Sequence, residues 1–191
     1  MIFDTRARYI APSFGNGQCS GIPVGVLSSD ATRRQAIRNP WGAQSCVYFI
    51  VGTRNGTWPH QEAAQRADVV LLDMEEVYHG LDSILPYKTA LWFYLGYQHF
   101  PRATHILKTD DDSYVNIGEL EREMAQVDPD YWGYVHRGAR PIRDPEHKWY
   151  MSSAMWRDDE IPDYCTGAGY LLSRRVLGCY VSRLSSQHYI A

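Results

Sequence analysis

Short, largely apolar runs alternate along this chain with segments that carry helix-start and helix-stop residues. The runs at residues 24–27, 46–51 and 68–72 are too short for ordinary helices and are typical of strands buried on both faces. Residues 104–108 are predicted to form a further strand. Strands that alternate with helices predict an α/β fold with a central, mostly parallel sheet flanked by helices. Ligands of such sheets bind beyond the carboxyl ends of the strands.

The segments between these runs contain helix signals. Residues 28–30 can cap a helix over residues 31–38, which Pro40 stops. Pro86 suits the first turn of a helix that ends near residue 99. The other predicted elements are a short helix over 62–66, strands over 131–136 and 168–172, a helix from Asn116 to Met124 and a last helix from Ser173 to about Leu184.

The Gly-rich, polar start of the chain does not continue this alternation. Residues 1–22 are expected to form an irregular stem or leader, and residues 23–191 the folded domain. Residues 1–16 carry scattered charges rather than the apolar core of a signal peptide. No apolar run approaches the roughly 20 residues that span a bilayer, so a membrane anchor is expected only outside this chain.

Charge and cysteine content exclude further classes. The net charge is −3 and no basic stripe is visible, which argues against a nucleic-acid surface. The four cysteines form no Cys-x-x-Cys pair, so a zinc ribbon is disfavoured. A bridge between Cys165 and Cys179 and two free thiols remain open alternatives.

Three consecutive aspartates, Asp110 to Asp112, stand at the end of the strand that is predicted over 104–108, separated from it only by Thr109. Adjacent carboxylates repel one another, so placing them after a buried strand is costly unless a cation compensates. Carboxylate oxygens are hard ligands that suit magnesium or manganese. Because residues i and i+2 of an extended backbone point the same way, Asp110 and Asp112 can face one metal while Asp111 faces elsewhere.

Other interpretations of the acidic triplet remain open. It can be a solvated acidic turn or a helix N-cap cluster. A calcium site is a further alternative, although the Gly and distal Glu of an EF-hand loop are absent.

Five motifs occur in an order that is similar to one glycosyltransferase family. They are Arg33 to Arg38 followed by Trp41-Gly42; Val47 to Gly52; Glu75 or Glu76, then Asp82 and Leu85 to Thr89; Lys108 with Asp110 to Asp112 and Val115-Asn116; and Ile161 to Ser173. The chain resembles the β1,3-galactosyltransferases and β1,3-N-acetylglucosaminyltransferases, the inverting group that includes Fringe. The short linker before Lys88 and the Lys-Trp-Tyr at 148–150 resemble protozoan members that build surface glycoconjugates.

The resemblance implies a GT-A-type nucleotide-sugar-binding fold and an enzyme. The implied activity is an inverting hexosyltransferase that moves galactose or N-acetylglucosamine from UDP-galactose or UDP-N-acetylglucosamine to a hydroxyl of a glycan acceptor, in a β1,3 linkage. The implied cofactor is manganese or another divalent cation. Full-length family members are type II membrane proteins of the Golgi lumen.

The resemblance also implies roles for individual residues. Asp110 and Asp112 are the expected metal ligands. The expected donor-binding residues are Arg34, Arg38, Lys88, Lys108, Asp110, Asp111, Gly167, Gly169 and Tyr170. For Arg38 the alternative is a surface ion pair, for Lys88 a carboxylate partner or a solvated face, for Lys108 plain charge balance, and for the glycines a tight turn.

The match departs from the family at two places. Pro40 stands where the family has Thr, a minor change. The family's second acidic motif, Glu-Asp-Val followed by Gly, is thought to supply the general base and is absent up to Ala191. The base and the C-terminal part of the domain are therefore expected beyond Ala191, with Asp158 and Asp163 as weak candidates inside the chain.

Two alternative functions remain open. One is a non-catalytic remnant that keeps donor binding, and the other is a carbohydrate-binding or calcium-dependent module.

Overall fold

The computed structural model describes residues 8–14, 19, 21–39, 41–42, 46–78 and 83–183. Its strands are β1 (Tyr9–Ile10), β2 (Val24–Leu27), β3 (Val47–Thr53), β4 (Val69–Glu75), β5 (His105–Asp110), β6 (Tyr131–His136) and β7 (Tyr164–Ser173). Its helices are α1 (Ala31–Arg38), α2 (His60–Gln65), α3 (Leu85–His99), α4 (Ile117–Val127) and α5 (Arg174–Arg183).

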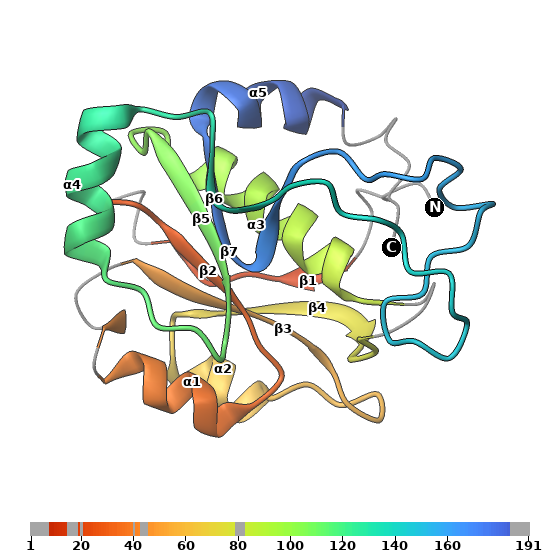
Figure 1. Cartoon of the computed structure of the whole chain (residues 1–191). Coiled ribbons are helices and arrows are strands. Elements are labelled where there is room, and N and C mark those ends of the chain that lie inside the picture. Colours follow the sequence, from red (N-terminus) through yellow and green to blue (C-terminus); the bar gives the residue numbers. More distant parts are fainter. Residues whose placement is uncertain are drawn as a thin grey trace.

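The strands form one mixed sheet in the order β1-β4-β3-β2-β5-β7-β6 (Figure 1). The four central strands, β4, β3, β2 and β5, are parallel to one another. The edge strand β1 and the pair β7 and β6 are antiparallel to their neighbours. The predicted α/β fold with a mostly parallel centre is confirmed.

The sheet is covered by helices on both faces (Figure 1). One buried cluster joins alternate strand residues such as Val26 and Phe49 to Ile37 of α1 and Leu120 of α4, and Ala63 of α2 packs against it. The second cluster lies on the opposite face, between the sheet and helices α3 and α5. Because successive strand residues point to opposite faces, the continuous apolar runs supply both clusters at once.

Most helix ends lie where the local signals predict them. The Asp30 side chain accepts hydrogen bonds from the first turn of α1, and the Asn116 side chain does the same for α4. Pro86 lies in the first turn of α3. The Ser173 hydroxyl accepts a bond from Val176 N at the start of α5. Pro40 and Leu184 lie outside the described residues.

Strands β3, β4 and β5 end two or three residues beyond their predicted ends, and β7 and β1 depart further from the sequence-based prediction. Strand β7 begins at Tyr164, four residues before the predicted start, because small residues rather than an apolar run make up its first half. Strand β1 lies within the segment that was expected to be irregular, and it pairs with Leu71 and Leu72 of β4. Phe14 of that segment is also buried, in the core cluster that lies between the sheet and helices α3 and α5. Part of residues 1–22 is therefore built into the domain.

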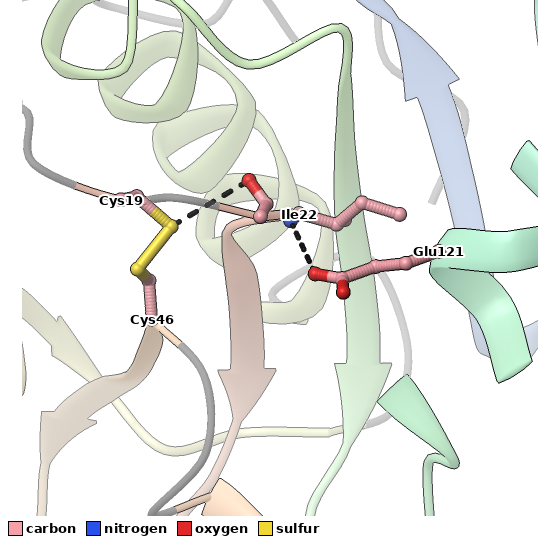
Figure 2. The surroundings of a disulfide bond; sticks show 5 residues. Cys19, Ile22, Cys46 and Glu121 are labelled. Carbon is pink, nitrogen blue, oxygen red and sulfur yellow. Dashed lines mark hydrogen bonds between the residues drawn. A yellow bond between two sulfur atoms is a disulfide. The ribbon is translucent and has the colours of Figure 1, made fainter. Parts of the chain in front are cut away.

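A disulfide between Cys19 and Cys46 ties this segment to the start of β3 (Figure 2). In the same region, Glu121 of α4 accepts a hydrogen bond from Ile22 N at 3.3 Å. The open alternative of a bridge between Cys165 and Cys179 is wrong, because the first is a buried free thiol and the second an exposed one.

Within the described residues, no helix combines the length and the apolar character that a bilayer span requires.

Candidate functional site

The carboxyl ends of β2 and β5 lie side by side at the point where the order of the strands reverses. From β2 the chain leads through α1 to β3 on one side, whereas from β5 it leads through α4 to β6 on the other side. The connections that leave these two carboxyl ends therefore diverge, which makes this a topological switch point, where open α/β sheets usually bind their ligands. Leu27 at the end of β2 pairs with Asp110 at the end of β5. Ser28 and the acidic triplet consequently lie together at this switch point.

The three aspartates have different surroundings. The Asp110 side chain is 35% exposed, and its Oδ1 accepts a bond from Lys108 Nζ at 2.6 Å. The Asp111 side chain is only 10% exposed, and its two oxygens accept from Ser28 Oγ and Arg33 Nη1, both at 2.8 Å. The Asp112 side chain is 66% exposed and lies 3.9 Å from Arg33 Nη1. Asp110 and Asp112 are thus open to a ligand, and Asp111 is not.

Lys108 forms an ion pair with Asp110 and holds its carboxylate in place. Its side chain is buried, and its ammonium also donates to the carbonyl oxygen of Gly167 on the neighbouring strand β7. Burial lowers the pKa of Lys108, and the adjacent Asp110 carboxylate opposes that shift. Lys108 thus balances the charge of Asp110, which is its alternative role, and its expected contact with the donor stays a prediction.

Lys88 is fully buried and paired with a carboxylate rather than exposed to a diphosphate. Its ammonium lies 2.6 and 2.7 Å from the two oxygens of Glu76 and donates to the Ser28 carbonyl at 2.9 Å. Burial lowers the pKa of Lys88 to about 8, although Glu76 acts in the opposite direction. The Tyr78 hydroxyl also donates to Glu76, at 2.7 Å, so this buried carboxylate accepts hydrogen bonds from both Lys88 and Tyr78.

The structure does not bring Arg34 or Arg38 directly to the triplet. Arg38 Nε lies 2.7 Å from Asp68, directly before β4, and Nη2 lies 2.9 Å from Glu62 of α2. Arg34 is buried and pairs with the same Glu62, and its Nη1 reaches the Ser28 hydroxyl at 3.2 Å. Arg38 therefore forms ion pairs, but its side chain is only 12% exposed and so they are not the surface pair of its alternative role. Its expected contact with the donor stays a prediction. Arg34 is separated from Asp111 by one hydroxyl.

Gly167 and Gly169 of β7 lie beside the carboxyl end of β5. Gly167 is exposed, and a Cβ placed there would meet only Lys108 Nζ, at 3.9 Å. Gly169 is partly buried and pairs with Thr109 of β5. The Lys108 ammonium lies 5.9 Å from the centre of the Tyr170 ring, whose hydroxyl has a pKa raised mainly by burial. The backbone at Gly167 is therefore accessible beside Asp110 and Lys108, whereas the Tyr170 ring packs beside the buried Lys108 ammonium.

Sequence reasoning missed two residues of the site, Arg33 and Ser28. Arg33 lies in the first turn of α1, where a cation is unfavourable against the helix dipole unless an anion compensates it. The same argument singled out Lys88 and could have found Arg33. Nothing in the local sequence marks Ser28, because its partner Asp111 is 83 residues away.

The candidate bases lie in the long segment between β6 and β7. Asp163 is exposed and lies 3.4 Å from Arg137. Asp158 is exposed, and its carbonyl accepts a bond from Arg143 at 3.1 Å. Neither carboxylate contacts the triplet in the part of the chain that the structure describes.

Asp110 and Asp112 can hold a divalent cation only if groups from outside the chain complete its ligand set. Among the described residues, no group of three or more His, Cys, Asp or Glu side chains is arranged to hold a metal. The two exposed carboxylates offer hard oxygen atoms, and a diphosphate and water would have to supply the rest. Such sharing is usual for magnesium and manganese in phosphate-binding sites.

Comparison with known proteins assigns the family. The galactosyltransferase family model matches residues 32–190. Mouse β-1,3-galactosyltransferase 5 is 29% identical over 157 residues, which are 75% of this chain and 50% of the relative. Rat lactosylceramide 1,3-N-acetyl-β-D-glucosaminyltransferase is 32% identical over 167 residues, 75% of this chain and 43% of the relative. β-1,3-Galactosyltransferase GALT1 of Arabidopsis thaliana is 28% identical over 171 residues, 81% of this chain and 26% of the relative.

The chain thus spans about half or less of the length of these relatives. The family match itself covers most of the chain, and the mixed α/β sheet is consistent with the GT-A-type domain that the sequence motifs imply. The chain belongs to the galactosyltransferase family.

Proposed function

We propose that this chain carries the donor site of an inverting hexosyltransferase. The enzyme moves galactose or N-acetylglucosamine from a UDP-sugar to a hydroxyl of a glycan, in a β1,3 linkage, as a step of glycoconjugate biosynthesis. Manganese, or another divalent cation, is held by Asp112 and Asp110 together with the donor diphosphate.

One observation carries this proposal. Two accessible carboxylates, Asp110 and Asp112, lie at the carboxyl end of β5 at the switch point, and the half-exposed guanidinium of Arg33 lies 3.9 Å from Asp112. A solvated acidic turn needs no buried lysine beneath it and no arginine beside it. A metal and diphosphate site needs both carboxylates and cations, because the bound group carries charges of both signs.

The residues have separate tasks in this proposal. The cation would stabilise the negative charge that develops on the departing diphosphate. Arg33 is placed to contact the same phosphates, since it lies at the amino end of α1, where the helix dipole also favours an anion. Lys108 keeps Asp110 oriented, and the open backbone at Gly167 leaves room for the donor sugar.

The sugar and the linkage rest on the names of the relatives. Two of the relatives are named as β-1,3-galactosyltransferases and one as a 1,3-N-acetylglucosaminyltransferase, so the names agree on the position but differ in the sugar. An inverting transfer needs a base on the acceptor side. Asp158 and Asp163 are the candidates for that base within the described residues.

The proposed location is the Golgi lumen, as for the family. The disulfide between Cys19 and Cys46 supports this location, because such bonds persist in the oxidising secretory pathway and are rare in the cytosol.

Calorimetry with UDP tests the proposed function. UDP is titrated into the chain with manganese and then with a chelator. Binding of UDP that requires manganese supports the donor site. Equal affinity for UDP in the presence of the chelator would show that donor binding does not need the metal. No binding of UDP under either condition, with binding of free glycans, would favour a carbohydrate-binding module instead.

A thermal-shift screen then identifies the sugar. UDP-galactose, UDP-N-acetylglucosamine and UDP-glucose are compared with UDP, each with manganese. The donor is expected to raise the melting temperature more than UDP does. A UDP-glucose shift larger than both others would contradict the proposed donor pair.

A further inference from the structure

Ser28 is a buried meeting point of four parts of the chain. It is the first residue after β2 and is 1% exposed. Its amide donates to Ile50 O of β3 at 3.1 Å, and its carbonyl accepts from Lys88 of α3 at 2.9 Å. Its hydroxyl accepts from Arg34 Nη1 of α1 at 3.2 Å and donates to Asp111 Oδ2 at 2.8 Å. Every polar atom of Ser28 is thus committed.

Asp111 depends on Ser28 for one of its two anchors. Arg33 supplies the other, but its side chain is 54% exposed and its ion pair is correspondingly weak. The bond from the buried hydroxyl is shielded from water and is the more rigid contact. Because Asp111 lies between Asp110 and Asp112, a fixed Asp111 carboxylate sets the turn that presents the two exposed carboxylates.

A buried ion pair keeps Ser28 in place. Lys88 donates to both the Ser28 carbonyl and the Glu76 carboxylate, and Glu76 also accepts from Gly52 N of β3 at 2.5 Å. The backbone at Ser28 is therefore anchored from α3 and β3, while its hydroxyl faces the triplet. Such support behind a ligand typically changes metal affinity by about 10- to 100-fold when it is removed.

We propose that Ser28 is a positioning residue of the metal and diphosphate site, which acts by holding Asp111 so that Asp110 and Asp112 face one cation. The inference rests on the proposed function. It assigns to Lys88 and Glu76 the role of supporting Ser28 rather than contacting the donor.

Ser28→Ala is the direct test, with Ser173→Ala as its matched control. Ser173 is also buried, and its hydroxyl donates to the Asp130 carboxylate at 2.6 Å, but it lies at the amino end of β5, away from the triplet. Both variants lose a hydroxyl-to-carboxylate bond and are expected to lower the melting temperature to a similar extent. Only Ser28→Ala is expected to weaken manganese-dependent UDP binding, by about tenfold.

A double-mutant cycle with Asp111→Asn tests whether Ser28 acts through Asp111. The effects of Ser28→Ala and Asp111→Asn on UDP affinity are expected to be strongly non-additive, because Ser28→Ala removes this bond and Asp111→Asn replaces its charged acceptor with an amide oxygen. Additive effects, or wild-type affinity in Ser28→Ala, would overturn the proposal. If Ser28→Ala does not fold, Asp111→Asn alone decides: wild-type manganese-dependent affinity in that variant would overturn the proposal as well.

Different results would overturn the proposed function and the role of Ser28. If the unmodified chain shows no manganese-dependent UDP binding, the proposed function fails. If the unmodified chain binds and Ser28→Ala binds equally well, only the role of Ser28 fails.

Discussion

The Lys88 ammonium and the Glu76 carboxylate form an ion pair from which water is excluded. Their side chains are 0% and 3% exposed, and the shortest distance between them is 2.6 Å. The pair joins α3 to the end of β4 directly behind Ser28. A buried pair of this kind contributes little net stability compared with apolar residues, but the loss of one partner leaves the other charge unpaired.

Lys88→Met is therefore expected to lower the free energy of unfolding by about 3 to 5 kcal/mol, because Glu76 would remain buried without its cation. Urea unfolding followed by circular dichroism measures the change. Arg122→Ala is the control: its exposed pair with Glu119 should contribute less than about 0.5 kcal/mol. A Lys88→Met protein as stable as Arg122→Ala would contradict the buried ion pair between Lys88 and Glu76.

The carboxylate of Glu62 gives the fold a defined acid sensitivity. Hydrogen bonds and charge from Arg34, and then Arg38, hold the pKa of Glu62 below its ordinary value of 4.5. Because the folded-state pKa is depressed, the stabilisation is fully present above pH 4.5 and is lost as the pH falls through the lower folded value.

Comparison of the wild-type chain with Glu62→Gln measures this contribution. The wild-type advantage in melting temperature is expected to be constant between pH 5 and 7 and to shrink at pH 4 and below. Glu146→Gln, at an exposed position, is expected to show no such trend. An advantage that grows on acidification would contradict the ion-pair assignment.

Gly25 of β2 leaves the space in which Trp92 of α3 packs against the sheet. A Cβ at Gly25 would lie 2.2 Å from the buried Trp92 indole, whose Nε1 donates to Leu107 O at 2.8 Å. Gly25→Ala is expected to destabilise the chain by about 1 to 3 kcal/mol, because neither the ring nor the strand can move freely. In α4, Gly118→Ala meets no atom within 4 Å and should instead stabilise by about 0.5 kcal/mol. Thermal unfolding of both variants checks the opposite signs, and equal effects would contradict the packing.

The disulfide is expected to stabilise the N-terminal segment against the domain. Cys19 and Cys46 are separated by 27 positions, for which loop closure predicts about 2 to 4 kcal/mol. Cys46→Ser should lose that amount in urea unfolding, whereas Cys179→Ser, an exposed free thiol, should change stability by less than about 0.5 kcal/mol. An unchanged Cys46→Ser protein would show that the bond is not formed in solution.

The local elements of this fold are predictable because their signals lie within a few residues. Strand β2 begins and ends where its apolar run does, and Asp30 begins α1 as a capping residue should. Strand β1 is too short to show any pattern, and the first half of β7 consists largely of small residues that pack against a neighbouring strand. Both are defined by pairing partners that are distant in sequence, which a local pattern cannot supply.

The candidate site also combines features that local sequence predicts with features that depend on distant residues. The position of the acidic triplet after a buried strand follows from local patterns, and the structure places it at the predicted edge of the sheet. The partners of its members do not follow, since Ser28 and Arg33 are 83 and 78 residues from Asp111. Arg38 shows the converse, because an arginine in a recognised motif is engaged by carboxylates that local sequence could not identify.

Asp112→Asn tests the central claim most directly. The Asp112 side chain is 66% exposed and adjoins two other carboxylates, so its neutralisation should leave the melting temperature unchanged or slightly raised. The account predicts that calorimetry will show UDP binding in manganese for the wild-type chain and at least about a tenfold loss for Asp112→Asn. Asp144→Asn, another exposed aspartate, should bind like the wild type. Manganese-dependent UDP binding of undiminished affinity in Asp112→Asn would contradict the account.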